Sequence, residues 1–367
     1  MTTVERVMEP ADPTEGLSAE EERIFVASFK QLMWWRFKKH RMALISLGVL
    51  AVFYFVVVFA EFVGPYDPEQ FFIKYKLAPP SAIRIRDAEG DFHWPFVYKI
   101  IRERDPETLR SLYMDDETAR YPIRFFTRGF EYKLLGLIKT DIHLFGLEVP
   151  HEEQGLFLLG ADRLGRDLFS RLCYGARISL TLGLVGVFLS LVIGVVLGGV
   201  SGYYGGTIDT VIQRVIEFIR TIPSIPLWMA LSAALPRDWP VTRVYLGITI
   251  ILSLVGWTWM ARVVRGRFLS MREEDFVLSA RLTGSSEMRI ILVHMVPLFL
   301  SYIIASLTLS VPNMILAETG LSFIGLGLRP PAISWGVLLQ EAQNVTSREP
   351  LGGLDEVGGL EGLRGII

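Results

Sequence analysis

The chain has 367 residues, of which 51% are hydrophobic, and its mean hydropathy of +0.38 is too high for an ordinary soluble domain. Its formal net charge of −2 excludes a general attraction to nucleic acid or anionic lipid, and its single cysteine, Cys173, excludes an internal disulfide. These properties predict an all-α polytopic membrane protein.

The first predicted element is a transmembrane helix over 42–63, whose apolar run extends from Met42 to Ala60 without a charged residue. At about 1.5 Å per residue this run can cross roughly 30 Å of hydrocarbon. No cleavable signal-peptide pattern precedes it, so we expect an uncleaved anchor. The basic residues before it predict a cytoplasmic N-terminal segment, 1–41; they are Lys30, Arg36, Lys38, Lys39 and Arg41.

The region 64–159 is polar, mixed in charge and rich in aromatics, and it contains no transmembrane candidate. We therefore expect an inserted extracytoplasmic region that mixes strands with short helices. His93, His143 and His151 lie in it without the spacing of metal ligands, so no metal site is expected.

A stripe of small residues marks the second predicted span, about Ile178 to Tyr204. One small residue recurs every four positions, which lets the backbone of another helix approach closely. The stripe consists of Gly186, Ser190, Gly194, Gly198 and Gly202.

The third predicted span, about Ile208 to Leu235, begins with polar and charged residues. Charges this close to a membrane pair with one another or face an aqueous cavity. They therefore predict either a salt-bridge network or the cytoplasmic mouth of a pathway; they are Asp209, Gln213, Arg214, Glu217 and Arg220.

The fourth and fifth predicted spans cover Val244–Ala261 and about Ile290–Ala317, and the fifth contains Pro297 and Pro312. Glu318 follows the fifth apolar run, where it either faces the pathway or is an ordinary helix-end charge. The apolar stretch 320–336 is broken by Gly and Pro, which predicts a re-entrant or interfacial segment. Five spans from a cytoplasmic N-terminus place 270–287 in the cytoplasm.

The loop 270–287 predicts a short helix followed by a sharp turn. Ser270 and Glu273 have the spacing of a capping box, so the helix is expected to begin at Ser270. Gly284 can adopt the left-handed conformation that ends a helix, and Ser285 or Ser286 can cap the next one. The apolar side of the short helix must lie on the membrane surface or dock into a partner; its residues are Phe276, Val277, Ala280 and Leu282.

The stretch "DFVLSARLTGSSEMRIILVHMVP" resembles the cytoplasmic coupling loop of ABC importer permeases. That loop has a small residue pair, here Ser279 and Ala280, a glycine four residues later, here Gly284, and a proline thirteen residues after it, here Pro297. Leu278 occupies the position where the family usually has glutamate. "LGADRLGRDLFSRLCYGARISLTLG", "GYYGGTIDTVIQRVIEFIRTIPSIPL" and "ILAETGLSFIGLGLRPPAISWGVLLQEAQN" resemble, in the same order, the C-type permease subunit of the dipeptide/oligopeptide (peptide/nickel) branch.

The resemblance implies a MetI-like permease fold with five recognisable transmembrane helices and a core over 160–345. It differs from the family in the long insertion that separates "LAPPS" (77–81) from "GADRLGRD" (160–167) within the region 64–159. It also differs in the atypical tail 346–367, which has no run long enough for a sixth span. We expect the resemblance to stop near Val345 and the last helix of the family to be missing.

The resemblance also implies a multi-pass subunit in a prokaryotic plasma membrane that works with partners. These would be two ABC ATPase subunits, a second permease subunit and an extracytoplasmic substrate-binding protein. The chain has no GxxxxGK[ST] loop, so no enzymatic activity and no cofactor of its own are expected. The residues that the resemblance assigns to coupling are Glu274, Ser279, Ala280, Gly284 and Pro297.

Two other classes of function remain as alternatives. A membrane-anchored receptor that binds a ligand through the insertion would require a cytoplasmic output domain, which is not recognisable in the sequence. A stand-alone channel or carrier would require inverted repeats or more spans.

Overall fold

The computed structural model describes residues 29–104, 111–149, 154–236 and 238–346. The predicted tail 346–367 therefore lies outside the described residues, apart from Thr346. The chain divides into two compact units, Met1–Phe55 and Val56–Ile367.

The first unit contains the helix α2 (Phe29–Lys39) and most of the helix α3 (Arg41–Val58). Trp34 stacks on Phe37, and Lys38 lies over the Trp34 ring. His40 separates the two helices, and its Nδ1 accepts a hydrogen bond from the Ala43 amide at 3.1 Å. The predicted first span is confirmed as an apolar helix, α3, which is followed by the short helix α4 (Ala60–Val63).

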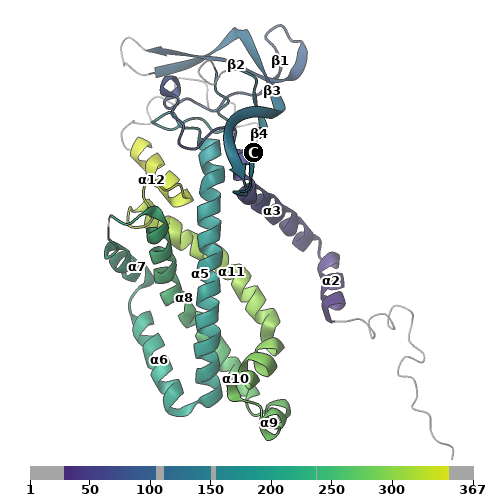
Figure 1. Ribbon diagram of the computed structural model, residues 1–367, viewed down its shortest axis with the longest axis vertical. Coiled ribbons are helices and arrows are strands. Elements are labelled where there is room, and N and C mark those ends of the chain that lie inside the picture. The colour runs from purple at the N-terminus through teal and green to yellow at the C-terminus, as the bar shows by residue number, and fades with distance from the viewer. Residues whose placement is uncertain (1–28, 105–110, 150–153, 237, 347–367) are drawn as a thin grey trace, which may run out of the picture. The chain divides into compact units, whose positions relative to one another are not determined.

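The region after the first span folds into a four-stranded antiparallel sheet in the order β1-β2-β3-β4 (Figure 1). Its strands are β1 (Arg84–Arg86), β2 (Phe92–Arg104), β3 (Ser111–Leu134) and β4 (Ile138–Leu147), and a single 3₁₀ turn, η1 (Ile73–Tyr75), precedes them. The long strand β3 pairs with β2 through its first half and with β4 through its second half. An aromatic cluster that includes Tyr66, Phe72 and Phe157 forms a core beside the sheet.

His143 ties the sheet to the end of the first span. Its Nδ1 lies 2.9 Å from the carbonyl oxygen of Gly64 and its Nε2 lies 3.1 Å from that of Phe130, while its ring packs against Phe130 and Tyr132. These contacts give His143 a packing role. His93 instead pairs with Asp87 at the opposite end of the sheet, and His151 lies outside the described residues.

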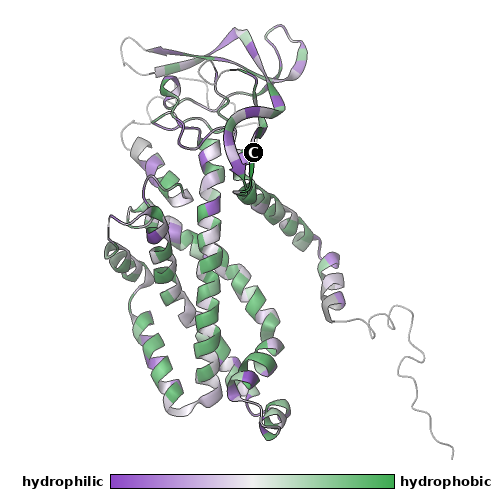
Figure 2. Cartoon of the chain, viewed as in Figure 1, coloured by the Kyte–Doolittle hydropathy of each residue, from purple (hydrophilic) through white to green (hydrophobic). Residues whose placement is uncertain are grey.

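Three long helices form the membrane part of the second unit: α5 (Leu168–Tyr204), α8 (Val241–Met271) and α11 (Leu300–Phe323). Figure 2 shows hydrophobic residues along all three. The second predicted span is confirmed, but α5 begins ten residues earlier, where the Asp167 carboxylate accepts a hydrogen bond from the Ser170 amide at 2.7 Å. At about 1.5 Å per residue α5 is roughly 55 Å long, so it extends beyond the hydrocarbon.

The small-residue stripe of α5 faces its neighbouring helices. A Cβ atom at Gly194 would lie 2.7 Å from Cβ of Met260, and one at Gly198 would overlap the backbone of Ala261. A Cβ at Gly202 would lie 2.7 Å from the carbonyl oxygen of Arg265. Gly186 borders Met314 of α11, and the Ser190 hydroxyl donates to the Ser253 carbonyl of α8. The absence of larger side chains is therefore what brings α8 and α11 against α5.

The third predicted span, about Ile208 to Leu235, corresponds to a bent pair of helices. It consists of α6 (Gly206–Thr221) and α7 (Ser224–Ala233), which meet at an angle of 85°. Pro223 and Pro226 explain the break, because proline lacks the amide donor of a helix interior and its ring crowds the preceding turn. Among the described residues, four helices are long and apolar enough to cross a membrane, or five if this bent pair counts as one span.

The close contact between α5 and α8 generates a first prediction. Gly198→Ala should lower the apparent melting temperature of the purified protein in detergent, because the added methyl group overlaps Ala261. Gly266→Ala is the matched control, since Gly266 also lies inside a helix and has no atom near its missing Cβ. Both changes gain about 1 kcal/mol of helix propensity. Equal melting temperatures for the two variants would show that the stripe is not a packing constraint.

The cap of α5 generates a second prediction, on pH. Burial raises the pKa of Asp167 from 3.8 to about 6, so between these values the folded protein holds a proton that the unfolded chain has released. Stability therefore falls as the pH rises through this window and is constant above it. Asp167→Asn keeps a capping oxygen and cannot ionise, so the wild type should lose melting temperature relative to this variant between pH 4 and pH 6. Parallel pH profiles of the two proteins would contradict the assignment.

Candidate functional site

The segment between α8 and α11 contains the predicted coupling residues. The predicted helix start at Ser270 is wrong, because α8 continues to Met271 and the Ser270 hydroxyl donates to the Arg267 carbonyl within its last turn. The short helix α9 (Asp275–Leu282) begins later, with Glu274 as its N-cap residue. The capping-box spacing does not mark a helix start here because the preceding helix, α8, continues through Ser270.

Gly284 ends α9 as the sequence predicts, with a φ of +78°. The Ser285 amide donates to the Ala280 carbonyl, and the Gly284 amide donates to the Arg281 carbonyl. These two bonds form a Schellman motif, in which the residue at the glycine position must be left-handed. Nothing lies within 4 Å of the missing Cβ of Gly284, so its backbone conformation alone requires glycine.

The faces of α9 have different surroundings. Val277 and Ala280 are buried in a cluster with Ile290, Ile291 and Met295, which lie just after the turn. Leu278 and Leu282, one helical turn apart, point outward, and Leu282 is 89% exposed. Phe276 also packs against this cluster, so only Leu282 of the predicted apolar side is left uncovered. The outward pair includes Leu278, which replaces the usual glutamate of the resemblance.

The helix that follows the turn is irregular around Pro297. Ser286 is the N-cap residue of α10 (Glu287–Arg289), which continues through a wide π-helical turn, η2 (Ile290–Met295), and a tight 3₁₀ turn, η3 (Val296–Phe299), into α11. A proline ring clashes with the carbonyl group four residues earlier in a regular α-helix, and the change of helix type accommodates it. The predicted fifth span is confirmed as an apolar helical segment, Glu287–Phe323.

Arg281 links α9 to the end of α5. Its Nε donates to the Tyr203 hydroxyl at 2.9 Å, and its guanidinium lies 4.7 Å from the centre of that ring. The short helix is therefore held to α5 by a polar contact as well as to α10 by apolar packing.

The charged residues at the start of α6 divide into two groups. Asp209 accepts two hydrogen bonds from Arg265 of α8, both at 2.5 Å, and it also binds the Ser201 hydroxyl. Arg214 pairs with Glu217 at 2.9 Å on the exposed face. Asp209, Arg214 and Glu217 line a shallow polar hollow, and Arg220 is not among its lining residues.

Glu318 is fully buried near the end of α11. Its carboxylate accepts hydrogen bonds from the hydroxyl groups of Ser322, Ser334 and, at 3.4 Å, Ser179. The Ser179 hydroxyl also accepts a bond from the Trp335 amide. Glu318 therefore joins α5, α11 and the start of α12 (Trp335–Thr346).

A cavity of about 460 Å³ lies among α5, α7, α8 and α11. Its wall is mostly apolar, and two indoles, those of Trp228 and Trp259, belong to it. Trp228 Nε1 is buried and has no hydrogen-bond partner among the described residues. Ser306, Ser310 and Asn313 of α11 add polar groups. The sequence reasoning missed this row, although polar residues at positions i, i+4 and i+7 of an apolar helix share one face.

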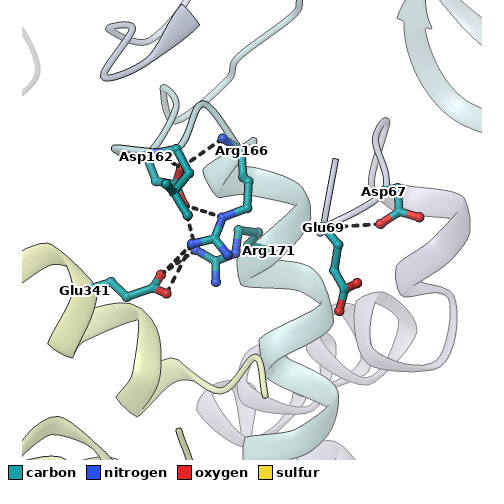
Figure 3. A network of polar contacts seen from close by, with 7 residues as sticks. Asp67, Glu69, Asp162, Arg166, Arg171 and Glu341 are labelled. Atoms are coloured by element: carbon teal, nitrogen blue, oxygen red, sulfur yellow. Dashed lines mark hydrogen bonds and ion pairs between the residues drawn. The ribbon is translucent and has the colours of Figure 1, made fainter. Parts of the chain in front are cut away.

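A buried network of four charges was also missed. Arg166 and Arg171 each bind both Asp162 and Glu341, at 2.5 to 3.1 Å (Figure 3). Asp162 and Arg166 belong to the "GADRLGRD" stretch, whereas Glu341 comes from α12, far away in the chain. The network fastens α12 to the start of α5, and its two positive and two negative charges balance. Only the tertiary pairing identifies Glu341 as the partner.

Residues 194–355 match the family model of the binding-protein-dependent transport system inner membrane component, and residues 28–80 match the N-terminal TM domain of oligopeptide transport permease C. The first match continues beyond Val345, where the resemblance was expected to stop.

Curated relatives include three named permeases. The dipeptide transport system permease protein DppC of Lactococcus lactis subsp. cremoris is 31% identical over 86% of this chain and 79% of its own length. DppC of Bacillus subtilis is 40% identical over 50% of this chain and 55% of its own length. The nickel transport system permease protein NikC of Escherichia coli K12 is 34% identical over 53% of this chain and 68% of its own length. The chain thus spans little more than half the length of some of the relatives it matches. Alignment with the Lactococcus protein over 86% of this chain must include part of the region 64–159.

Among solved structures, the inward-facing MetNI methionine ABC transporter matches 48% of this chain and 82% of that chain, with 18% identity and a TM-score of 0.37. The alternative of a membrane-anchored receptor finds no support among the named relatives. The two family models and the long Lactococcus alignment together show that this chain belongs to the family of binding-protein-dependent transport system inner membrane components, in the branch of the dipeptide, oligopeptide and nickel C-type permeases.

Proposed function

We propose that this chain is the permease subunit of an ATP-driven importer and forms half of the pathway for peptides or a similar small solute. The relatives named for dipeptides, oligopeptides and nickel support this substrate class. A second permease subunit supplies the other half, and an extracytoplasmic binding protein delivers the substrate. The chain itself needs no enzymatic activity and no cofactor.

The observation that carries this proposal is the construction of α9. Its outer face, Leu278 and Leu282, has no cover among the described residues, while its inner face is packed onto the segment that begins the last long span. An amphipathic helix with one free apolar edge fits a groove in a partner protein. The rigid turn at Gly284 would transmit a push on α9 to α10 and α11. ATPase subunits that close on binding ATP would supply that push.

The charge distribution supports a cytoplasmic position for α9. Arginines gather at the α9 ends of the long helices, which is the pattern of cytoplasmic loops. They are Arg262, Arg265, Arg267, Arg272, Arg281 and Arg289. The sheet lies at the other end of α5 and would therefore be extracytoplasmic, with the N-terminal segment 1–41 in the cytoplasm.

The cavity beside α11 is the best candidate for the pathway within this subunit. Ser306, Ser310 and Asn313 offer hydrogen-bonding groups on an apolar wall, and Trp228 offers a free indole donor. Such sparse polar groups can hold a peptide backbone briefly without binding it tightly. The hollow at Asp209, Arg214 and Glu217 lies at the α9 end of the helices, where it would form the cytoplasmic mouth.

Co-purification in mild detergent tests the proposed assembly. The wild-type chain, isolated from its native membrane, should carry two ABC ATPases and a second permease. Leu282→Glu should lose at least nine tenths of the ATPases and keep the second permease, because it puts a charge on the outer face of α9. Ile83→Glu, a change at an exposed aliphatic residue of the sheet region, is the control and should retain both. Recovery of the chain without any ATPase would contradict the proposed function.

The turn at Gly284 generates a separate prediction about coupling. Gly284→Val should abolish solute uptake while leaving membrane insertion intact, because a β-branched residue resists a φ of +78° and the left-handed conformation costs a typical residue roughly 1–2 kcal/mol. Gly284→Asn is the matched control, since asparagine tolerates this conformation, and it should retain most of the uptake. Uptake and ATP hydrolysis would be measured together in proteoliposomes. Normal uptake by the valine variant would refute the coupling role.

A further inference from the structure

The tip of the β3–β4 hairpin exposes a compact group of aliphatic side chains. Its sequence from Lys133 to Lys139 is "KLLGLIK", and Leu135, Leu137 and Ile138 are 58%, 84% and 64% exposed. Leu135 and Gly136 have φ angles of +53° and +74°, which close the turn and keep the leucines outward. No described residue covers this tip.

The hairpin runs alongside the outer ends of the first span and α5. Near the open end of the hairpin, Phe145 packs against Phe169, one residue into α5. Further along, His143 contacts Gly64 and Phe126 packs against Phe62 of α4. The order of these contacts shows that the hairpin follows α4 as it approaches its tip.

Glu61 and Arg177 mark the level at which the apolar part of α5 begins. Their side chains form two hydrogen bonds of 2.5 and 2.6 Å, and Arg177 also donates to the carbonyl groups of Val57 and Val58. Residues 178–204 contain no charged side chain, so the hydrocarbon can begin just past this pair.

The hairpin continues past that level. Tyr132 is opposite Thr140 and lies close to Glu61. Burial is the main cause of the raised pKa of Tyr132, and the negative charge of Glu61 adds to it. Strand β3 continues for two residues past Tyr132, to Leu134, and the turn follows it. At about 3.3 Å per residue the strand carries the base of the turn roughly 7 Å further, and the exposed turn extends beyond it toward the lipid headgroups.

The charges at the neck of the tip favour an anionic partner. Lys133 and Lys139 are directly opposite each other across the two strands, and Leu134 is opposite Ile138 just beyond them. Like charges at opposite positions repel and destabilise a hairpin. Among the described residues neither lysine has an acidic partner in an ion pair, so their repulsion is not relieved within the chain.

We propose that the tip Leu134–Ile138 inserts into the lipid leaflet next to α5, with Lys133 and Lys139 bound to lipid phosphates. Aliphatic side chains at the tip and lysines one step behind match the two layers of an interface, since lysine can rest its carbon chain among lipids while its ammonium group reaches the headgroups. The sheet would then be anchored to the membrane at two places, the first span and this tip. The inference requires α5 to span the membrane but does not depend on the transport function.

Spin-label depth measurement on the full-length chain in nanodiscs tests the proposal. A nitroxide on Leu137→Cys should be relaxed several-fold more by lipid-soluble oxygen than by a water-soluble nickel chelate. A nitroxide on Glu89→Cys, in the exposed β1–β2 turn, is the matched control and should show the reverse preference. The native Cys173 is buried, and a mock-labelled wild-type sample measures its background. Both substituted residues are exposed, so neither change disturbs the core.

Two outcomes would overturn the proposal. Equal access of the nickel chelate to the labels at 137 and 89 would show that the tip lies in water. Exclusion of both relaxing agents from the label at 137 would show that protein covers the tip instead of lipid. Preferential relaxation by oxygen at 137 would support insertion.

Discussion

The close approach of α8 and α11 to α5 is the constraint on which the membrane part of this protein depends. At Gly194, Gly198 and Gly202 the neighbouring helix occupies the space that any side chain would need. In a bilayer, lipid competes with protein for apolar surface, so contact of backbones and fit of shape must replace the hydrophobic effect as the reason for helices to associate. The cavity beside α11 can exist because these contacts hold its walls.

Paired charges fix the ends of the same helices. The Asp162, Arg166, Arg171 and Glu341 network holds α12 to the start of α5, and the Asp209–Arg265 pair holds α6 to α8 at the other end. Each group neutralises itself, which matters because an isolated charge near hydrocarbon is costly. The middles of the helices therefore associate through close fit of their surfaces, and the ends associate through specific pairs of opposite charge.

The short helix α9 combines both kinds of contact. Val277 and Ala280 pack onto the beginning of the last span, Arg281 reaches Tyr203 of α5, and Gly284 adopts the left-handed conformation that ends the helix. Leu278 and Leu282 point outward from the same helix.

The sequence alone determined the apolar helices, the small-residue stripe and the glycine turn, because each depends on residues close together in the chain. The partner of Arg171, the burial of Glu318 and the end of α8 past Ser270 depended on the tertiary structure. For Arg171 and Glu318 the deciding contacts come from distant segments of the chain. For α8, the helix continues through the residues that resembled the start of a new helix. The break near Pro223 depends on both, since the sequence contains the prolines but only the packing of the helices sets the 85° bend.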